Sequence, residues 1–125
     1  RQMPELAPKN PMILNNLAWA LGKVNDNSAI SIAEQAVALA PNSPIVLDTL
    51  GVLYLESGDA AKAIEHLRKA VSLGPKLPQL HVSLARALAK SGDKDGARKE
   101  LDEAQKGATD NSPLRAEIDK LRATL

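Results

Sequence analysis

The sequence predicts an all-α fold, a right-handed solenoid of stacked helix pairs that ends in a capping helix. The first observation is a repeat, because Ser-Gly-Asp occurs at Ser57–Asp59 and again at Ser91–Asp93. A fixed spacing of this size is typical of stacked structural repeats. The second observation is that aromatic residues make up only 2% of the chain and include no Phe. The core must therefore consist of Leu, Ala, Val and Ile, which pack well between helices.

The same register extends beyond the tripeptide. At the spacing of the two tripeptides, the second copy matches the third at Leu50/Leu84, Ala63/Ala97, Leu67/Leu101 and Ala70/Ala104. Leu17 lies one position closer to Leu50 than Leu50 lies to Leu84, so the first copy lacks one residue near positions 23–27. The pattern divides the chain into repeats at residues 11–43, 44–77 and 78–111 and a capping helix at 112–125. Residues 1–10 are expected to be the tail of a preceding repeat or a linker, which predicts that the chain is a piece of a longer array.

Each repeat is expected to contain two antiparallel helices joined by the Ser-Gly-Asp turn. In the second copy Pro44 suits a first helical turn, and the run Ile45–Leu55 fits a helix that is covered on most sides. Gly58 is the expected left-handed residue of the turn, and Asp59 then caps the second helix. That helix has one apolar stripe, formed by Ala60, Ala63, Ile64, Leu67, Ala70 and Val71.

The segment 112–125 predicts one further helix, with Ser112 as its cap and Pro113 in its first turn. Its single apolar stripe consists of Leu114, Ile118, Leu121 and Leu125. Asp119 stands where a small packing residue is expected. This substitution indicates a polar outer face, which terminal repeats need for solubility.

The pattern of the second copy is carried by nine positions. They are Leu47, Leu50, Gly51, Tyr54, Gly58, Ala63, Leu67, Ala70 and Pro75. Together with the fixed period, they resemble the tetratricopeptide-repeat signature over residues 11–111. The resemblance implies a concave groove, lined by the first helices, that binds a protein or peptide. Three places depart from the signature: His81 replaces the usual Trp or Leu, Thr109 replaces Pro, and the first turn, GKVNDNS, is one residue short and lacks a glycine at the usual place.

Composition and motifs argue against several other functions. The net charge of +1 gives no electrostatic case for nucleic acid, and no apolar run is long enough to span a membrane. The sequence has no catalytic serine motif, Gly-rich phosphate loop or cluster of His and Cys at metal-ligand spacing. His66 and His81 fall in different helices, and neither is expected to bind a metal. We therefore predict a protein that is not an enzyme and has no cofactor or metal site.

The expected groove is lined by the first helix of each repeat. Helical spacing gives its candidate partner-binding residues as Met12, Asn15, Asn16, Trp19 and Lys23, then Ile45, Asp48, Thr49, Val52 and Glu56, then Gln79, Val82, Ser83, Arg86 and Lys90. Trp19 has two interpretations. It is either an anchor for a bound peptide or a side chain that packs against a preceding repeat.

One subclass of these repeats binds the C-terminal carboxylate of heat-shock chaperones through Lys, Asn and Arg side chains at five groove positions. Those positions here carry Asn15, Trp19, Thr49, Gln79 and Ser83. None is cationic, so a carboxylate would lose its charge-assisted hydrogen bonds and this ligand is excluded. Arg86 and Lys90 can still hold an acidic group elsewhere in the groove.

A finer resemblance concerns longer phrases such as LNNLAWALG and LARALAKSGDKDGARKEL. They are similar to the C-terminal repeats of large bacterial tetratricopeptide proteins associated with PEP-CTERM sorting and exopolysaccharide export, which implies a periplasmic or envelope-associated scaffold. The predicted function is a scaffold that binds a peptide or protein in the groove. Two alternatives stay open. One is a structural module that forms a homodimer through its exposed N-terminal repeat end, and the other is the repeat region of a larger enzyme such as a glycosyltransferase.

Overall fold

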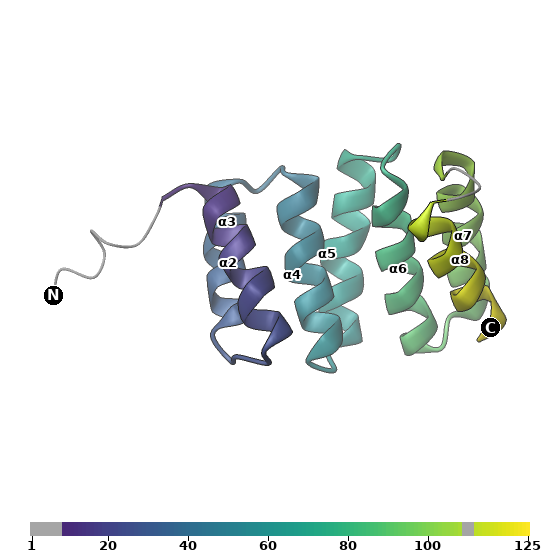
Figure 1. Cartoon of the computed structure of the whole chain (residues 1–125), viewed down its shortest axis with the longest axis horizontal. Coiled ribbons are helices and arrows are strands. Elements are labelled where there is room, and N and C mark those ends of the chain that lie inside the picture. Colours follow the sequence, from purple (N-terminus) through teal and green to yellow (C-terminus); the bar gives the residue numbers. More distant parts are fainter. Residues whose placement is uncertain (1–8, 109–111) are drawn as a thin grey trace, which may run out of the picture.

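The computed structural model describes residues 9–108 and 112–125, which form seven α-helices and no β-strand (Figure 1). The first pair is α2 (Pro11–Lys23) and α3 (Ala29–Leu39), the second is α4 (Pro44–Glu56) and α5 (Ala60–Leu73), and the third is α6 (Pro78–Ser91) and α7 (Lys94–Gly107). α8 (Pro113–Ala123) packs against α6 and α7. The helices stand in a row, so the fold is the all-α solenoid that the sequence predicts. Residues 1–8 of the expected tail and Thr109 lie outside the described residues.

Proline and a polar cap set the start of the first helix in most pairs. Pro11 and Pro44 occupy first-turn positions, where the missing N–H has no helical partner to lose. The Asn10 side chain accepts a hydrogen bond from the Met12 N–H at 2.8 Å, and the Ser43 hydroxyl accepts one from the Val46 N–H at 3.4 Å. These bonds satisfy backbone donors that a helix leaves free at its start.

The turn inside each pair needs one residue with a left-handed backbone. Gly58 and Gly92 have φ angles of +96° and +97° in the second and third pairs, a conformation that glycine adopts without steric cost. Asn25 takes the same place in the first pair with φ of +58°, because asparagine tolerates this region better than most residues. The first pair therefore also has a left-handed turn residue, and this residue is Asn25 instead of the glycine of the other two pairs.

Compared with the second copy, the first copy is one residue shorter, and the difference falls at the start of its second helix. The Asp26 N–H donates to the Leu21 carbonyl at 2.9 Å, and Asp59 makes the same bond to Tyr54. However, α3 has 11 residues and begins after a further turn, whereas α5 has 14 and begins directly after Asp59. Asp26 Oδ1 holds the extra turn by accepting from the Ser28 N–H at 2.9 Å and its hydroxyl at 2.6 Å. The hydroxyl and backbone bonds from Ser28 lower the pKa of Asp26.

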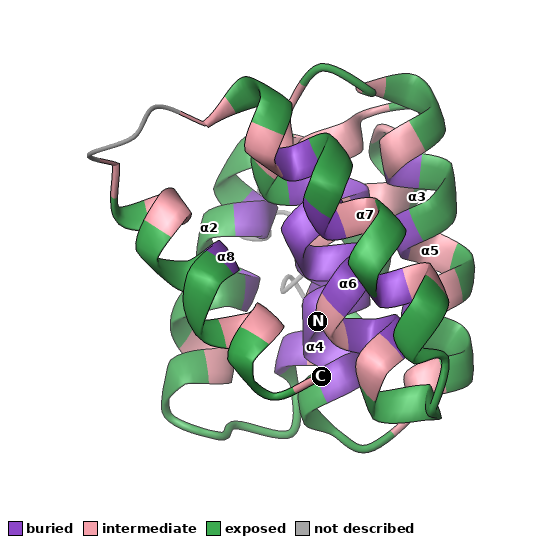
Figure 2. Ribbon diagram, turned by 90° about the vertical axis from the view of Figure 1, so that its right-hand side faces the viewer, coloured by how far each residue is buried: buried purple, intermediate pink, exposed green. Residues whose placement is uncertain are grey.

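Small residues allow the helices of a pair to approach closely. A Cβ atom on Gly51 would lie 2.6 Å from the Leu67 side chain, so a larger residue would push α4 and α5 apart. Ala63 and Ala70 on α5 are completely buried. Burial is concentrated in α4 and α6, which have neighbours on most sides (Figure 2).

Two side chains of first helices make polar bridges to neighbouring elements. The Tyr54 hydroxyl donates to the Glu34 carboxylate at 2.5 Å, and this bond is the main reason that the pKa of Tyr54 rises to about 12. His81 is 5% exposed, and its Nδ1 and Nε2 atoms lie 2.8 Å from Glu100 Oε1 and 2.7 Å from the Pro75 carbonyl oxygen. His81 thus joins α6 to α7 and to the preceding turn, which accounts for this departure from the repeat signature.

The N-terminal end of the solenoid is apolar. Ile13 and Leu17 on α2 are 52% and 41% exposed, whereas their equivalents on α4, Val46 and Leu50, are 1% and 2% exposed. The difference arises because α3 packs against α4, while no helix of the described residues covers the same side of α2. Ile13 and Leu17 form what we call the end strip.

The C-terminal end carries charged side chains on α8 and on the neighbouring α7. Ile118 is completely buried and holds α8 against the core. Arg115 Nε lies 3.5 Å from Asp119 Oδ1, and Arg122 Nη2 lies 2.7 Å from Asp102 Oδ1 on α7. An apolar helix would have to desolvate these charges in order to pack there, so α8 disfavours further stacking.

Candidate functional site

The first helices of the pairs form the inner face of the solenoid. α2 contacts α4, α4 contacts α6, and α6 contacts α8, whereas α3, α5 and α7 make no comparable contacts with one another within the described residues. Helices on the inside of a curved stack lie closer together than those on the outside. We therefore define the inner face as the surface of α2, α4 and α6, and this is the face on which the sequence places its candidate groove residues.

The candidate residues differ widely in exposure. Seven are exposed, namely Met12, Asn16, Trp19, Lys23, Glu56, Gln79 and Lys90. Three are partly buried, namely Ile45, Asp48 and Arg86. Five are buried, namely Asn15, Thr49, Val52, Val82 and Ser83. Because Val52 and Val82 are only 2% exposed, the expectation that all of these side chains line an open groove was too broad.

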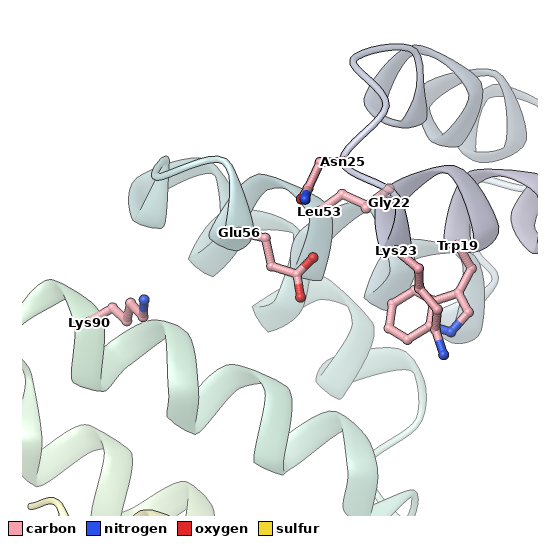
Figure 3. Close-up of a pocket in the computed structure, with 7 residues that line it drawn as sticks. All are labelled: Trp19, Gly22, Lys23, Asn25, Leu53, Glu56 and Lys90. Carbon is pink, nitrogen blue, oxygen red and sulfur yellow. The ribbon is translucent and has the colours of Figure 1, made fainter.

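A pocket of about 470 Å³ opens on the inner face near the C-terminal ends of α2, α4 and α6. Its lining residues are Trp19, Gly22, Lys23, Asn25, Leu53, Glu56 and Lys90 (Figure 3). Trp19 is 42% exposed, and the Lys23 Nζ atom lies 5.9 Å from the centre of its ring. Figure 3 shows these two side chains together on one side of the pocket, with Glu56 and Lys90 on neighbouring helices.

Three residues that line the pocket were not predicted from the sequence, namely Gly22, Asn25 and Leu53. Gly22 and Leu53 meet closely, because a Cβ atom on Gly22 would lie 2.5 Å from the Leu53 side chain. Asn25 reaches the pocket from the left-handed turn. Gly22 in the last turn of α2 could have indicated this contact, because a helical glycine frequently marks the close approach of another side chain.

The centre of the inner face contains hydrogen-bond acceptors that lack donors. The Oδ1 atoms of Asn15 and Asp48 are both buried and accept no hydrogen bond from the protein. The Thr49 hydroxyl donates to the Ile45 carbonyl at 3.2 Å, and the Ser83 hydroxyl donates to the Gln79 carbonyl at 3.1 Å. The Thr49 hydroxyl thus donates within its own helix, whereas the Ser83 hydroxyl also acts on the Asp48 carboxyl and lowers its pKa.

Asp48 is the most perturbed acid of the inner face. Burial raises the pKa of its carboxyl to about 6, against the opposing effects of the Ser83 hydroxyl and the Arg86 guanidinium. Among the described residues no ion pair within 4.0 Å joins Asp48 to a cationic side chain. The cost of burying the Asp48 carboxylate thus outweighs the favourable effects of Ser83 and Arg86, which is why the pKa rises.

The described part of the chain offers no metal centre. No group of three or more His, Asp or Glu side chains within residues 9–108 and 112–125 is arranged to hold an ion. In the same residues, every helix is too short or too polar to cross a membrane.

Comparisons with known proteins agree with this architecture. Two tetratricopeptide-repeat family models match residues 15–78 and 54–123. The chain is 31% identical over 121 residues to the tetratricopeptide repeat and J domain-containing co-chaperone DNJ1 of Fusarium oxysporum f. sp. lycopersici, a match that covers 94% of this chain and 22% of that protein. It is 41% identical over 71 residues to the probable biofilm formation methyltransferase WspC of Pseudomonas putida, covering 57% of this chain and 17% of that protein. The chain thus spans about a fifth of these relatives.

A solved structure extends the match to nearly the whole chain. The type III secretion translocator chaperone SycD of Yersinia enterocolitica superposes with a TM-score of 0.82 at 18% identity, over 99% of this chain and 96% of that one. This likeness concerns the fold alone. Each family match covers at least half of the chain, so the chain belongs to the tetratricopeptide-repeat family.

Proposed function

We propose that the chain is a non-catalytic scaffold that binds a peptide segment of a partner protein on its inner face. The observation that carries this proposal is the pocket around Trp19, because it is formed jointly by α2, α4 and α6. A half-exposed tryptophan beside a depression is the kind of anchor that dominates peptide and protein binding. A protein of similar fold, SycD, has been solved in complex with a peptide of the translocator YopD, which supports peptide binding by a chain of this fold.

Trp19→Ala tests this proposal. Peptides selected from a random library on the wild-type chain are expected to bind the variant about 10-fold to 30-fold more weakly, since an aromatic anchor contributes about 2 kcal/mol. Calorimetry gives the affinities, and circular dichroism checks that the variant is folded. Leu73→Ala is the matched control, because Leu73 is 41% exposed on α5, outside the inner face. Equal affinity of the wild type and Trp19→Ala would contradict the proposal.

The end strip favours a second candidate, self-association as a homodimer. Exposed Ile13 and Leu17 stand where later repeats have buried residues, and two copies could cover them by packing end to end. Leu17→Glu should then convert a concentration-dependent dimer into a monomer in light scattering. A wild-type chain that stays monomeric at all concentrations would overturn this candidate.

We further propose that the protein acts in exopolysaccharide assembly in the bacterial envelope. The support is the resemblance of its repeat sequences to those of large bacterial tetratricopeptide proteins associated with exopolysaccharide export. Fractionation of the producing bacterium tests it, and recovery of the protein from the cytosol alone would contradict it. The alternative of a repeat region within a larger enzyme is favoured by the match to WspC, a probable methyltransferase. A catalytic domain encoded in the same reading frame would support that alternative.

A further inference from the structure

We propose that the pocket beside Trp19 selects partner segments in which an aspartate or glutamate lies close to an apolar residue. Lys23 and Lys90 bind the carboxylate, and the ring of Trp19 packs against the apolar residue. The inference rests on the function proposed above, because it names the chemistry of the peptide that this pocket recognises. It concerns a side-chain carboxylate, since neither lysine occupies one of the five positions at which related repeats bind a terminal one.

The first argument is the charge of the accessible pocket. Among the described residues that line it, Lys23 on α2 and Lys90 on α6 carry ammonium groups, and Glu56 on α4 carries a carboxylate. Two positive charges against one negative charge leave the lining positive. All three side chains are exposed, so a ligand reaches them from the solvent. A surface of this kind is complementary to an anionic group.

The second argument is that the chain does not use the two ammonium groups in ion pairs of its own. Within the described residues no carboxylate oxygen lies within 4.0 Å of the Nζ atom of Lys23 or Lys90. Glu56 thus pairs with neither, although Figure 3 shows it between Lys90 and the side of the pocket that holds Trp19 and Lys23. Each ammonium group therefore offers its N–H donors to a ligand carboxylate.

The third argument is that an apolar surface adjoins the charges. Trp19 is 42% exposed, and the Lys23 Nζ atom lies 5.9 Å from the centre of its ring. A carboxylate bound at Lys23 therefore brings a neighbouring side chain of the same segment close to the ring, which gains from being covered. Side chains share one side at a spacing of two residues in an extended segment and three or four in a helix. We expect the apolar residue at such a spacing from the acid.

The test is a double-mutant cycle on the protein and a selected peptide. Peptides are selected from a random library on the wild-type chain and made with an amidated C-terminus, so that their carboxylates are side chains. Lys90→Met keeps the unbranched stem and removes the charge. This variant, and replacement of the acid of the peptide by its amide, should each weaken binding about 3-fold to 10-fold. The double variant should lose little more than either single one, because both remove the same interaction.

Lys62→Met is the matched control for Lys23→Met. Lys62 is an exposed lysine on α5, outside the inner face, and its Nζ atom lies 5.4 Å from the centre of the Tyr54 ring. The substitution thus removes the same charge beside an aromatic ring, and it should leave the affinity unchanged. Equal losses for Lys62→Met and Lys23→Met would show that only the total charge of the chain matters, which would overturn the inference.

Glu56→Gln gives an effect of the opposite sign. It removes a carboxylate that repels the acid of the ligand, so binding should become about 2-fold to 5-fold stronger. Weaker binding would mean that Glu56 holds a basic group of the ligand, and the inference would fail.

The outcomes separate this inference from the proposed function. Binders that need Trp19 but keep their affinity for Lys23→Met and Lys90→Met would overturn the inference while the proposed function stands. The same holds for binders that lose their affinity when the C-terminus is amidated, because a terminal carboxylate is then the ligand. Binders with equal affinity for the wild type and Trp19→Ala, or a library that yields no binder, overturn both.

Discussion

Leu50→Ala is expected to lower the free energy of unfolding by about 2–5 kcal/mol, the usual range for truncation of a leucine inside a packed core. Leu50 is 2% exposed and belongs to the main hydrophobic cluster. Leu17 occupies the same register on α2 but is 41% exposed. Leu17→Ala should therefore lower the same free energy by less than about 1 kcal/mol, because much of its side chain is never removed from water.

Urea denaturation of both variants measures this difference directly. The pair forms a controlled comparison, because the substitution and the position within the repeat are the same and only the covering helix differs. Equal losses would contradict the arrangement, since they would require that Leu17 is covered in solution. Repeating the measurement at several protein concentrations would then show whether a second copy covers the end strip.

Asp48→Asn is expected to raise the free energy of unfolding by about 1–3 kcal/mol at pH 7. Burial raises the pKa of the Asp48 carboxyl to about 6 in the folded chain, so the folded state binds this proton more tightly than the unfolded state. The contribution of Asp48 to stability is therefore fully present below about pH 4, where aspartate is protonated even when unfolded. It is lost as the pH rises through about 6. Asparagine has no such charge to bury, so the variant avoids the loss.

The measurement is denaturation of the wild type and Asp48→Asn between pH 4 and pH 7. The difference between the two proteins should be close to zero at pH 4 and reach its full size at pH 7. Glu56→Gln should change stability by less than about 0.5 kcal/mol, since Glu56 is exposed. A difference that stays constant with pH would show that desolvation of the carboxylate is not its cause.

The repeat pattern predicts the fold well because the same local chemistry occurs twice at a fixed distance. Gly58 and Gly92 take the left-handed backbone that the turn needs, and Gly51 meets Leu67 at the close approach of α4 and α5. In each case a single residue type satisfies a strict geometric demand.

The inner face was harder to predict because helical spacing gives the direction of a side chain but not how its neighbours cover it. Val52 and Val82 have the register of groove residues and are nevertheless buried. Asn25 was missed because the left-handed place accepts asparagine as well as glycine. The raised pKa of the Asp48 carboxyl depends on its burial and on the groups of α6 that act on it, and this is a property of packing between repeats that no single segment specifies.

The different polarity of the two ends gives the array a direction. A further repeat unit that is duplicated on the N-terminal side would find the end strip ready to pack against it, whereas a unit added after α8 would meet paired charges. Changes in the length of such an array are thus tolerated at one end and resisted at the other. An engineer who wishes to lengthen the inner face should therefore insert new repeats before α2 and keep α8 as the terminus.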